Sequence, residues 1–363
     1  MSASSEAPRA CVLAPTGPVL TAEEAAFFRE AAPAGFCLFR RNCETPGQLS
    51  RLTAALRESV GRPVPILVDQ EGGRVQRLRP PAWPNDPAPA RLGALHALDP
   101  ESGRAAAAEL ARAMAIDLAA AGIDVDATPV LDLARPTDST VIGDRAFDDD
   151  PERVIALGRA VVEGLAAGGV APVIKHLPGH GRGIVDSHHA LPVVEASAED
   201  LAARDFRPFA ALADLPWGMT AHILFPALDP DRPATLSPRV IAETIRGAIG
   251  FDGVLVSDDL SMGALQGSIG ERAAVAVAAG CDLALHCNGD LAEMRAVAAA
   301  VPRLSAASAG RLDRAIAWQA RAAAERGRPD PTEAARLRAR VAERLSVVEA
   351  AEGTAGQSPV ASA

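Results

Sequence analysis

The chain has 363 residues, of which 48% are hydrophobic and 23% charged, and its formal net charge is −10. This composition predicts a soluble globular protein. The acidic balance, without a clustered basic stripe, argues against nucleic acid or an anionic membrane surface as the main partner. We therefore expect a small-molecule ligand and no stable membrane association.

Two further features predict the cellular compartment of the protein. The amino-terminal residues contain no apolar run behind a basic segment, and no stretch approaches the roughly 20 apolar residues that a membrane span needs. The five cysteines are an odd number in a chain large enough to fold without disulfides, which is typical of free thiols in a reducing compartment. We therefore expect a cytoplasmic protein. The oligomeric state stays open, with a monomer favoured.

Eight short apolar or β-branched runs predict strands. In chain order they are residues 12–14, 35–39, 66–69, 125–131, 173–176, 218–223, 254–258 and 282–287. Near-continuous apolar strands that alternate with helices are typical of a parallel sheet covered on its outer face.

Segments with helical periodicity alternate with these strands. Several begin at a residue that caps helices well, such as Thr21 with Glu24 three positions later, or Ser237 before Pro238. The eight predicted helices are residues 21–32, 45–60, 100–121, 151–167, 198–213, 238–249, 269–279 and 290–300. Eight alternating units predict an α/β fold, a single (β/α)₈ barrel of the TIM type. No glycine-rich fingerprint follows the first strand, which disfavours a dinucleotide-binding sheet.

Two more helices are predicted beyond the eighth unit, at residues 306–325 and 332–351, packed against the outside of the barrel. We expect residues 1–350 to form one catalytic domain that includes these helices. Residues 352–363 have the composition of a disordered tail.

Polar residues recur at the ends of the predicted strands, where barrels of this kind carry their active sites. A charged residue there is costly to desolvate unless it is paired or functional, so their recurrence predicts one common site. They are Asp69, Lys175, His176, His222, Ser257, Asp258, Asp259, His286 and Cys287.

Lys175 is unusual because it is the only lysine among 36 basic residues. A compact ammonium retained in an arginine-rich chain indicates a site that needs a point charge, and chance survival is the alternative. His96 lies in a polar connecting stretch and is expected at the surface.

Four stretches, residues 66–78 (ILVDQEGGRVQRL), 142–147 (IGDRAF), 174–192 (IKHLPGHGRGIVDSHHALP) and 256–265 (VSDDLSMGAL), resemble the family 3 glycoside hydrolases. Within the family they resemble the bacterial β-N-acetylglucosaminidases of peptidoglycan recycling (NagZ type). The resemblance covers residues 10–300 and preserves the order and spacing of the motifs. One departure is Leu177, where the family often has phenylalanine.

The resemblance implies the catalytic residues. Asp258 corresponds to the nucleophile, and His188 to a general acid/base that Asp186 holds two residues earlier in an Asp-Ser-His sequence. A histidine oriented by a carboxylate can donate and then accept a proton near neutral pH. Helix capping is the alternative for Asp258 and the first expectation for Asp259.

The resemblance also implies a sugar pocket. Its predicted members hold ring hydroxyls through charge-assisted hydrogen bonds and are Asp69, Arg77, Arg145, Lys175 and His176. Met262 and His222 either line the floor of this pocket or pack in the core.

These residues imply a retaining exo-β-N-acetylglucosaminidase. Its expected substrates are peptidoglycan fragments such as GlcNAc-1,6-anhydroMurNAc, with or without a peptide, cleaved through a covalent glycosyl-enzyme without a metal or other cofactor.

Three rival functions remain. A metal-dependent hydrolase would use the histidines His176, His180, His188 and His189, but Pro178 and Gly179 prevent the helix that would present the first two on one face. A catalytically silent sugar-binding barrel would lack Asp258 or His188, and both are present. Phosphorolysis is a third possibility, because a neutral histidine repels phosphate less than a carboxylate does.

Overall fold

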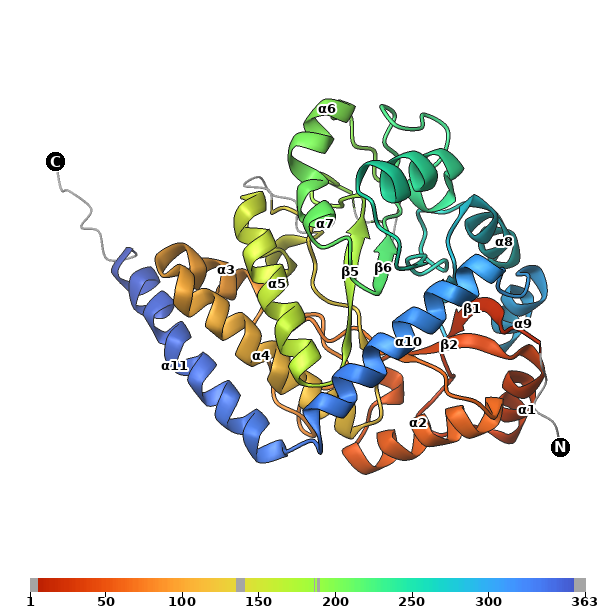
Figure 1. Ribbon diagram of the computed structural model, residues 1–363, viewed down its shortest axis with the longest axis horizontal. Coiled ribbons are helices and arrows are strands. Elements are labelled where there is room, and N and C mark those ends of the chain that lie inside the picture. The colour runs from red at the N-terminus through yellow and green to blue at the C-terminus, as the bar shows by residue number, and fades with distance from the viewer. Residues whose placement is uncertain (1–5, 135–140, 186, 188–189, 356–363) are drawn as a thin grey trace.

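Figure 1 shows the computed structural model, which describes residues 6–134, 141–185, 187 and 190–355. Eight strands form one sheet in the order β7-β6-β5-β4-β3-β2-β1-β8, and the neighbouring strands are parallel. Helices surround this sheet on its outer side. The predicted α/β class and the (β/α)₈ barrel are therefore confirmed.

The barrel closes at a seam between its two end strands, β7 and β8. Val256 and Leu283 form a single parallel bridge there. Two side chains extend the pairing: Oγ of Ser257 accepts from N of Leu285 at 2.9 Å, and Oδ2 of Asp282 accepts from N of Leu255 at 2.9 Å. Side-chain oxygens thus satisfy backbone donors at the seam, where a regular ladder would use carbonyls.

The strands lie where the sequence predicts them and differ only at their ends. They are β1 (Arg9–Leu13), β2 (Pro33–Leu38), β3 (Ile66–Val68), β4 (Val125–Asp126), β5 (Ala171–Leu177), β6 (Trp217–Thr220), β7 (Val254–Val256) and β8 (Ala284–His286). All their residues are buried apart from Arg9, as expected for a sheet covered by helices.

The predicted helices form as well. Thr21 makes the expected capping box with Glu24, and Asp150 caps the helix that begins at Pro151. The helices are α1 (Ala22–Ala31), α2 (Pro46–Val60), α4 (Pro100–Ala120), α5 (Pro151–Ala167), α6 (Ala198–Asp200), α7 (Arg207–Ala211), α8 (Ile269–Ala279) and α9 (Leu291–Ala300), with π-helical segments η3 (Leu201–Asp205) and η5 (Val240–Ala248) and 3₁₀ turns η1 (Arg40–Asn42), η2 (Gly143–Arg145) and η4 (Ala234–Leu236).

Helix α3 (Pro89–Leu98) goes beyond the sequence prediction, and it contains His96. The expectation that His96 lies at the surface is wrong, because α3 packs on α4 and leaves only 7% of His96 exposed. A glycine permits this packing, because a Cβ on Gly103 would lie 2.4 Å from Cα of His96. Earlier in α3, a Cβ on Gly93 would lie 1.7 Å from O of Phe147. Local polarity does not reveal such a close approach.

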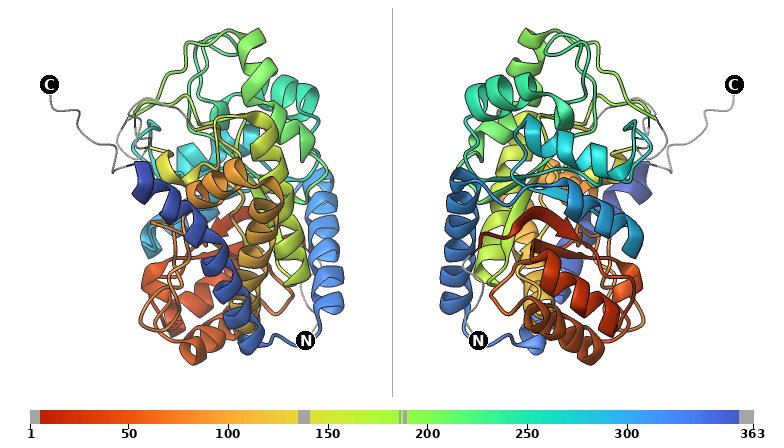
Figure 2. Two further views of the ribbon diagram at one scale, coloured as in Figure 1. Left: turned by 90° about the vertical axis from the view of Figure 1, so that its left-hand side faces the viewer. Right: turned by 90° about the vertical axis from the view of Figure 1, so that its right-hand side faces the viewer.

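Helices α10 (Ala306–Arg326) and α11 (Pro331–Ala355) lie on the outside of the barrel, as Figure 2 shows. α10 contacts α5, β5 and β7, whereas α11 contacts α3 and α4. α11 continues to Ala355 rather than ending at residue 351. Residues 352–355 thus belong to the helix rather than to the expected tail, of which residues 356–363 lie outside the described part.

None of the helices among the described residues combines the length and the apolar character needed to cross a membrane.

Candidate active site

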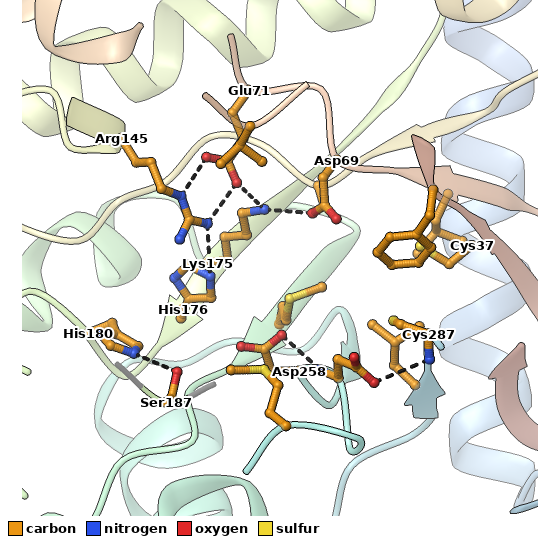
Figure 3. Close-up of a pocket in the computed structure, with 18 of the residues that line it drawn as sticks. Cys37, Asp69, Glu71, Arg145, Lys175, His176, His180, Ser187, Asp258 and Cys287 are labelled. Carbon is orange, nitrogen blue, oxygen red and sulfur yellow. Dashed lines mark hydrogen bonds and ion pairs between the residues drawn. The ribbon is translucent and has the colours of Figure 1, made fainter. Parts of the chain in front are cut away.

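A pocket opens at the carboxyl ends of the barrel strands, where residues far apart in the sequence meet (Figure 3). Its cavity volume is about 230 Å³. The predicted nucleophile and the six predicted substrate-binding residues line it: Asp258, Asp69, Arg77, Arg145, Lys175, His176 and Met262. The structure brings these side chains together, while their chemical roles stay predictions.

Asp69 directly follows β3 and binds two cations. Nζ of Lys175 donates to its Oδ1 at 2.9 Å, and Nη2 of Arg77 donates to its Oδ2 at 2.8 Å. Burial raises the pKa of Asp69, but the charges and hydrogen bonds of Lys175 and Arg77 outweigh burial and hold this pKa well below its ordinary value. Asp69 therefore stays ionised, in an orientation that two cations fix.

Glu71 is a member of this charged cluster that the sequence analysis does not single out. Its side chain is fully buried. Its Oε1 accepts from Nζ of Lys175 (2.5 Å) and Nη2 of Arg145 (2.8 Å), and its Oε2 accepts from Nε of Arg145 (2.7 Å). Burial raises the pKa of Glu71, but the charges of Arg145 and Lys175 outweigh it and lower this pKa to about 2. The sequence feature that could have identified Glu71 is its position, two residues after Asp69 at a strand end.

Lys175 and His176 are neighbours in β5, yet both face the pocket. The pairing register between β5 and β6 shifts between Ile174 and Leu177, which breaks the alternation of a regular strand. The pKa of Lys175 is lowered by burial but raised more strongly by Asp69 and Glu71, so it stays above its ordinary value. Lys175 is therefore a charged ammonium in the wall of the pocket.

The ring of His176 lies between an acidic and a basic side chain. Nη2 of Arg145 faces its Nε2 at 3.4 Å, and Oδ2 of Asp132 lies 2.7 Å from its Nδ1. Because a guanidinium can only donate, Nε2 of His176 accepts and Nδ1–H donates to Asp132. Asp132, which follows the predicted fourth strand by one residue, is a second supporting residue that the sequence analysis does not single out. It fixes the tautomer and orientation of His176.

Asp258 lies across the pocket from this charged cluster, directly after Ser257 at the end of β7 (Figure 3). N of Asp259 donates to its Oδ1 at 2.8 Å. Burial raises the pKa of Asp258, but His222, His176 and the N–H of Asp259 outweigh burial and lower it. Within the described part of the chain no lysine or arginine is paired with this carboxylate. Asp258 is therefore ionised, with oxygen lone pairs free to face a ligand.

Asp259 has a local structural role, but the predicted helix cap is wrong, because its side chain accepts within a turn and the next helix, α8, is capped by Ser268. Its Oδ1 accepts from N of Ser261 (3.0 Å) and from N of Cys287 (3.2 Å). His222 supports the same segment, because its Nε2 lies 3.0 Å from O of Asp259. Met262 and His222 were each expected either to line the floor of the pocket or to pack in the core. Met262 lines the pocket, whereas His222 is buried behind it.

The loop after β5 carries the predicted acid/base pair, but Asp186 and His188 lie outside the described residues. Between them, O of Ser187 accepts from N of Ala264 at 3.0 Å, and Oγ of Ser187 lies 3.4 Å from Nε2 of His180. Burial lowers the pKa of His180 to about 4, so this ring is neutral at pH 7. Ser187, which lies between the two predicted residues, therefore contacts Ala264 in the segment that follows Asp258.

The comparisons with known proteins agree with this geometry. Residues 16–317 match the family described as the glycosyl hydrolase family 3 N-terminal domain. The chain belongs to glycosyl hydrolase family 3. It is 42% identical over 294 residues to a β-hexosaminidase of Bordetella avium (strain 197N), covering 77% of this chain and 83% of that protein.

Solved structures of family 3 members have the same fold. NagZ from Neisseria gonorrhoeae, in complex with N-trifluoroacetyl-D-glucosamine, is 31% identical and superimposes with a TM-score of 0.81 over 94% of this chain and 99% of that one. A family 3 β-N-acetylglucosaminidase from Paenibacillus sp. str. FPU-7 is 34% identical, with a TM-score of 0.80 over 92% of this chain and 67% of that one. The chain is thus a glycoside hydrolase with a family 3 barrel.

The chemistry available to this family 3 pocket follows from its two kinds of carboxylate. Asp69 and Glu71 are neutralised by cations, whereas Asp258 keeps its charge unpaired among the described residues. Among these residues no group of three or more histidine, cysteine, aspartate or glutamate side chains is arranged to hold a metal ion. The arrangement suits hydroxyl recognition on one side and charge stabilisation or nucleophilic attack on the other.

Proposed function

We propose that this glycoside hydrolase, of the β-hexosaminidase type, is a retaining exo-β-N-acetylglucosaminidase of peptidoglycan recycling. It removes a terminal β-1,4-linked N-acetylglucosamine from fragments that end in 1,6-anhydro-N-acetylmuramic acid, with or without a peptide. The single observation that carries the proposal is the ionised Asp258, which lies across a small pocket from a cluster of five fixed charges. The β-hexosaminidase and N-acetylglucosaminidase relatives support the choice of sugar.

In the proposed mechanism the charged cluster recognises the sugar. Asp69 and Glu71 each accept from two cationic side chains, so these groups are ordered before the ligand arrives. Ordered donors and acceptors lose little conformational entropy on binding and select hydroxyl positions by direction. Arg77, Arg145 and Lys175 supply the donors, His176 contributes its ring to the same wall, and Met262 supplies an apolar wall.

Bond cleavage uses Asp258 and the loop after β5. An oxygen of Asp258 bonds to the anomeric carbon while the glycosidic bond breaks, and the departing oxygen takes a proton from His188. Water then attacks the same carbon, gives its proton back to His188 and releases Asp258. Two inversions at one carbon return the β product. The lowered pKa of Asp258 supports this role, because the attacking group has to be ionised.

The covalent step has a direct test. A fluorinated, slowly hydrolysed N-acetylglucosamine analogue is expected to leave a mass increment on a peptide that contains Asp258. A thiazoline, which mimics the intermediate of attack by the substrate's own acetamido oxygen, is expected to inhibit weakly. Absence of the label together with tight thiazoline binding contradicts the assignment of Asp258, and an inverted early product contradicts retention.

The assignment of His188 is tested through the leaving group. In His188→Ala the rate should fall most for substrates with a poorly acidic leaving group, because 4-nitrophenol departs with little help from a proton donor. Asp186→Asn should show the same pattern more weakly. Equal losses for good and poor leaving groups would show that His188 is not the acid.

The same proposal includes a cytoplasmic location, a monomer and a single catalytic domain over residues 1–350. Fractionation of the native host with an antibody to the protein tests the location. Light scattering of the purified chain tests the oligomeric state.

A further inference from the structure

Helix α11 lies beyond residue 317, where the family match ends, yet one of its side chains reaches toward the active site. Nε and Nη2 of Arg338 donate to the two carboxylate oxygens of Asp86 at 2.7 and 3.1 Å. Nη2 of Arg338 also lies 2.8 Å from Oδ2 of Asp117 in α4. The side chain of Asp86 is 1% exposed, so Arg338 neutralises a buried charge.

Asp86 lies in the segment between β3 and α3, and its backbone holds the turn that carries Glu71. O of Asp86 accepts from N of Gly73 at 2.9 Å, and N of Asp86 donates to Oε1 of Gln76 at 3.1 Å. Nε2 of Gln76 in turn donates to O of Gly73 at 2.7 Å. The backbone around Asp86 and the turn at residues 72–76 therefore move together.

Gln70 extends this connection to both ends of the sugar-binding loop, defined here as residues 69–78. Its Oε1 accepts from N of Arg77 and from N of Leu78, each at 3.0 Å. N of Glu71 donates to O of Val75 at 2.9 Å, which closes the turn. Asp69 and Arg77 then pair through their side chains at 2.8 Å. The side chains that line the pocket thus share one hydrogen-bonded frame.

This frame has little room to adjust. Gly72 has a φ of +91° and packs so closely that a Cβ there would lie 2.3 Å from O of Pro87. A Cβ on Gly73 would lie 2.7 Å from Cβ of Ala88. A shift of residues 86–88 therefore displaces the sugar-binding loop directly, since the contact is backbone against backbone.

Other ion pairs of α11 among the described residues join it to neighbouring helices, such as the pair of Glu349 with Arg91 of α3 at 3.6 Å. Nε of Arg340 donates to Oε1 of Glu109 in α4 at 2.9 Å, and Glu333 pairs with Arg112 of α4 at 2.7 Å. The last two pairs attach α11 to α4 only. Arg338 differs from them because its main partner belongs to the segment that backs the pocket.

We propose that Arg338 is a positioning residue, and that α11 takes part in substrate binding by fixing the sugar-binding loop through Asp86. This inference rests on the proposed sugar-binding role of Asp69, Glu71 and Arg77. Loss of the guanidinium leaves Asp86 a buried carboxylate, which moves toward water and takes the backbone of residues 86–88 with it.

The test compares Arg338→Met with Arg340→Met, two substitutions two residues apart on the same helix. Both are expected to lower the midpoint of thermal unfolding. Only Arg338→Met is expected to raise the KM for 4-nitrophenyl N-acetyl-β-D-glucosaminide and the calorimetric Kd for N-acetylglucosamine, each about tenfold, with kcat changed less than about threefold. A merely structural role instead lowers the fraction of active enzyme, so kcat falls while KM and Kd stay unchanged.

A second variant keeps the test decisive if Arg338→Met folds poorly. In Arg338→Met/Asp86→Asn the buried charge of Asp86 is absent, and Asp117 lies in α4 rather than in the sugar-binding frame, so Kd should return to within about threefold of the unmodified protein. The inference is overturned if Arg338→Met and Arg340→Met bind N-acetylglucosamine equally well, or if the double variant gives no recovery. Asp69→Asn distinguishes failure of this inference from failure of the proposed function. Unchanged binding of N-acetylglucosamine in that variant overturns the sugar-binding role of Asp69, whatever the result for Arg338.

Discussion

The two sides of the pocket treat their carboxylates differently. On the β3 and β5 side, Asp69 and Glu71 are each held by two cationic side chains at 2.5 to 2.9 Å. On the β7 side, the carboxylate of Asp258 accepts from a neighbouring backbone N–H, and the structure pairs it with no lysine or arginine among the described residues. All three have a lowered pKa, so the difference is one of pairing and not of ionisation.

This comparison indicates which carboxylate can react. A carboxylate whose oxygens are occupied by two cations is a poor nucleophile, because attack would require breaking those contacts in a buried site. Such a group recognises and orients. A carboxylate that is ionised and has free lone pairs can approach an anomeric carbon. The ion pairing of the carboxylates thus indicates that the β3 and β5 side binds the sugar and that the β7 side forms the covalent bond.

The largest expected effect comes from Asp258→Asn. The amide keeps the shape of the side chain but removes its charge and nucleophilicity, so kcat should fall on the order of 10⁴-fold. The Kd for N-acetylglucosamine should change by less than about threefold, since the binding side is intact. Isothermal titration beside steady-state kinetics measures both. A comparable loss in Kd and kcat would mean that Asp258 also binds, and the division between the two sides would fail.

Glu71→Gln should have the opposite effect and weaken binding more than it lowers kcat. The variant leaves Arg145 and Lys175 without their shared buried anion, so the ligand loses two ordered donors and Kd should rise about 100-fold. The free energy of unfolding in urea should fall as well, because uncompensated buried charges destabilise the fold. A Glu71 variant with normal Kd and reduced kcat would place this residue on the reacting side.

Lys175→Arg is a milder perturbation of the binding side. It keeps the positive charge but replaces a compact ammonium, 2% exposed, by a wider planar group that does not fit between Asp69 and Glu71. We expect kcat/KM to fall about tenfold, measured with 4-nitrophenyl N-acetyl-β-D-glucosaminide. Full activity would reduce the single lysine to an accident of composition.

The smallest expected effect concerns stability and pH. His180 has its pKa lowered from 6.5 to about 4, so the unfolded chain binds its proton first as pH falls, and folding stability is lost through this window. Between pH 6.5 and 5 the loss should be about 1.5 kcal/mol in urea unfolding.

His180→Asn provides the matched control because it should remove the loss between pH 6.5 and 5. Glu71 contributes at lower pH, since its stabilisation is present above 4.5 and is lost as pH falls through its folded pKa of about 2. If the control variant keeps the upper step, another group is responsible.

Much of the site could be predicted because barrel geometry converts sequence position into spatial position. Asp69, Lys175, His176 and Asp258 all follow or end a strand, so eight correctly placed strands bring them to one mouth. Arg77 and Arg145 lie in the segments beyond strand ends, and the motif resemblance singled them out. Met262 was a candidate because of its place after Asp258, with core packing as the alternative.

The missed residues share a different property. Glu71 lies two residues after Asp69, and Asp132 directly follows the predicted fourth strand. Their importance appears only through partners distant in sequence, because Glu71 pairs with Arg145 and Asp132 with His176. His96 was misplaced for the same reason, since the contact with Gly103 that buries it joins two helices. Periodicity describes one element at a time, and these residues are defined by contacts between elements.

The seam between β7 and β8 matters for recombination between barrels. Ser257 satisfies a donor of β8, and Asp282, just before β8, satisfies a donor of β7, so each side of the seam depends on a side chain from the other. A chimera whose crossover falls between residues 257 and 282 takes these two side chains from different parents. The boundary for exchanging half-barrels is therefore better placed elsewhere, for example between β2 and β3. There, three residues of one strand pair with three of the other through the backbone.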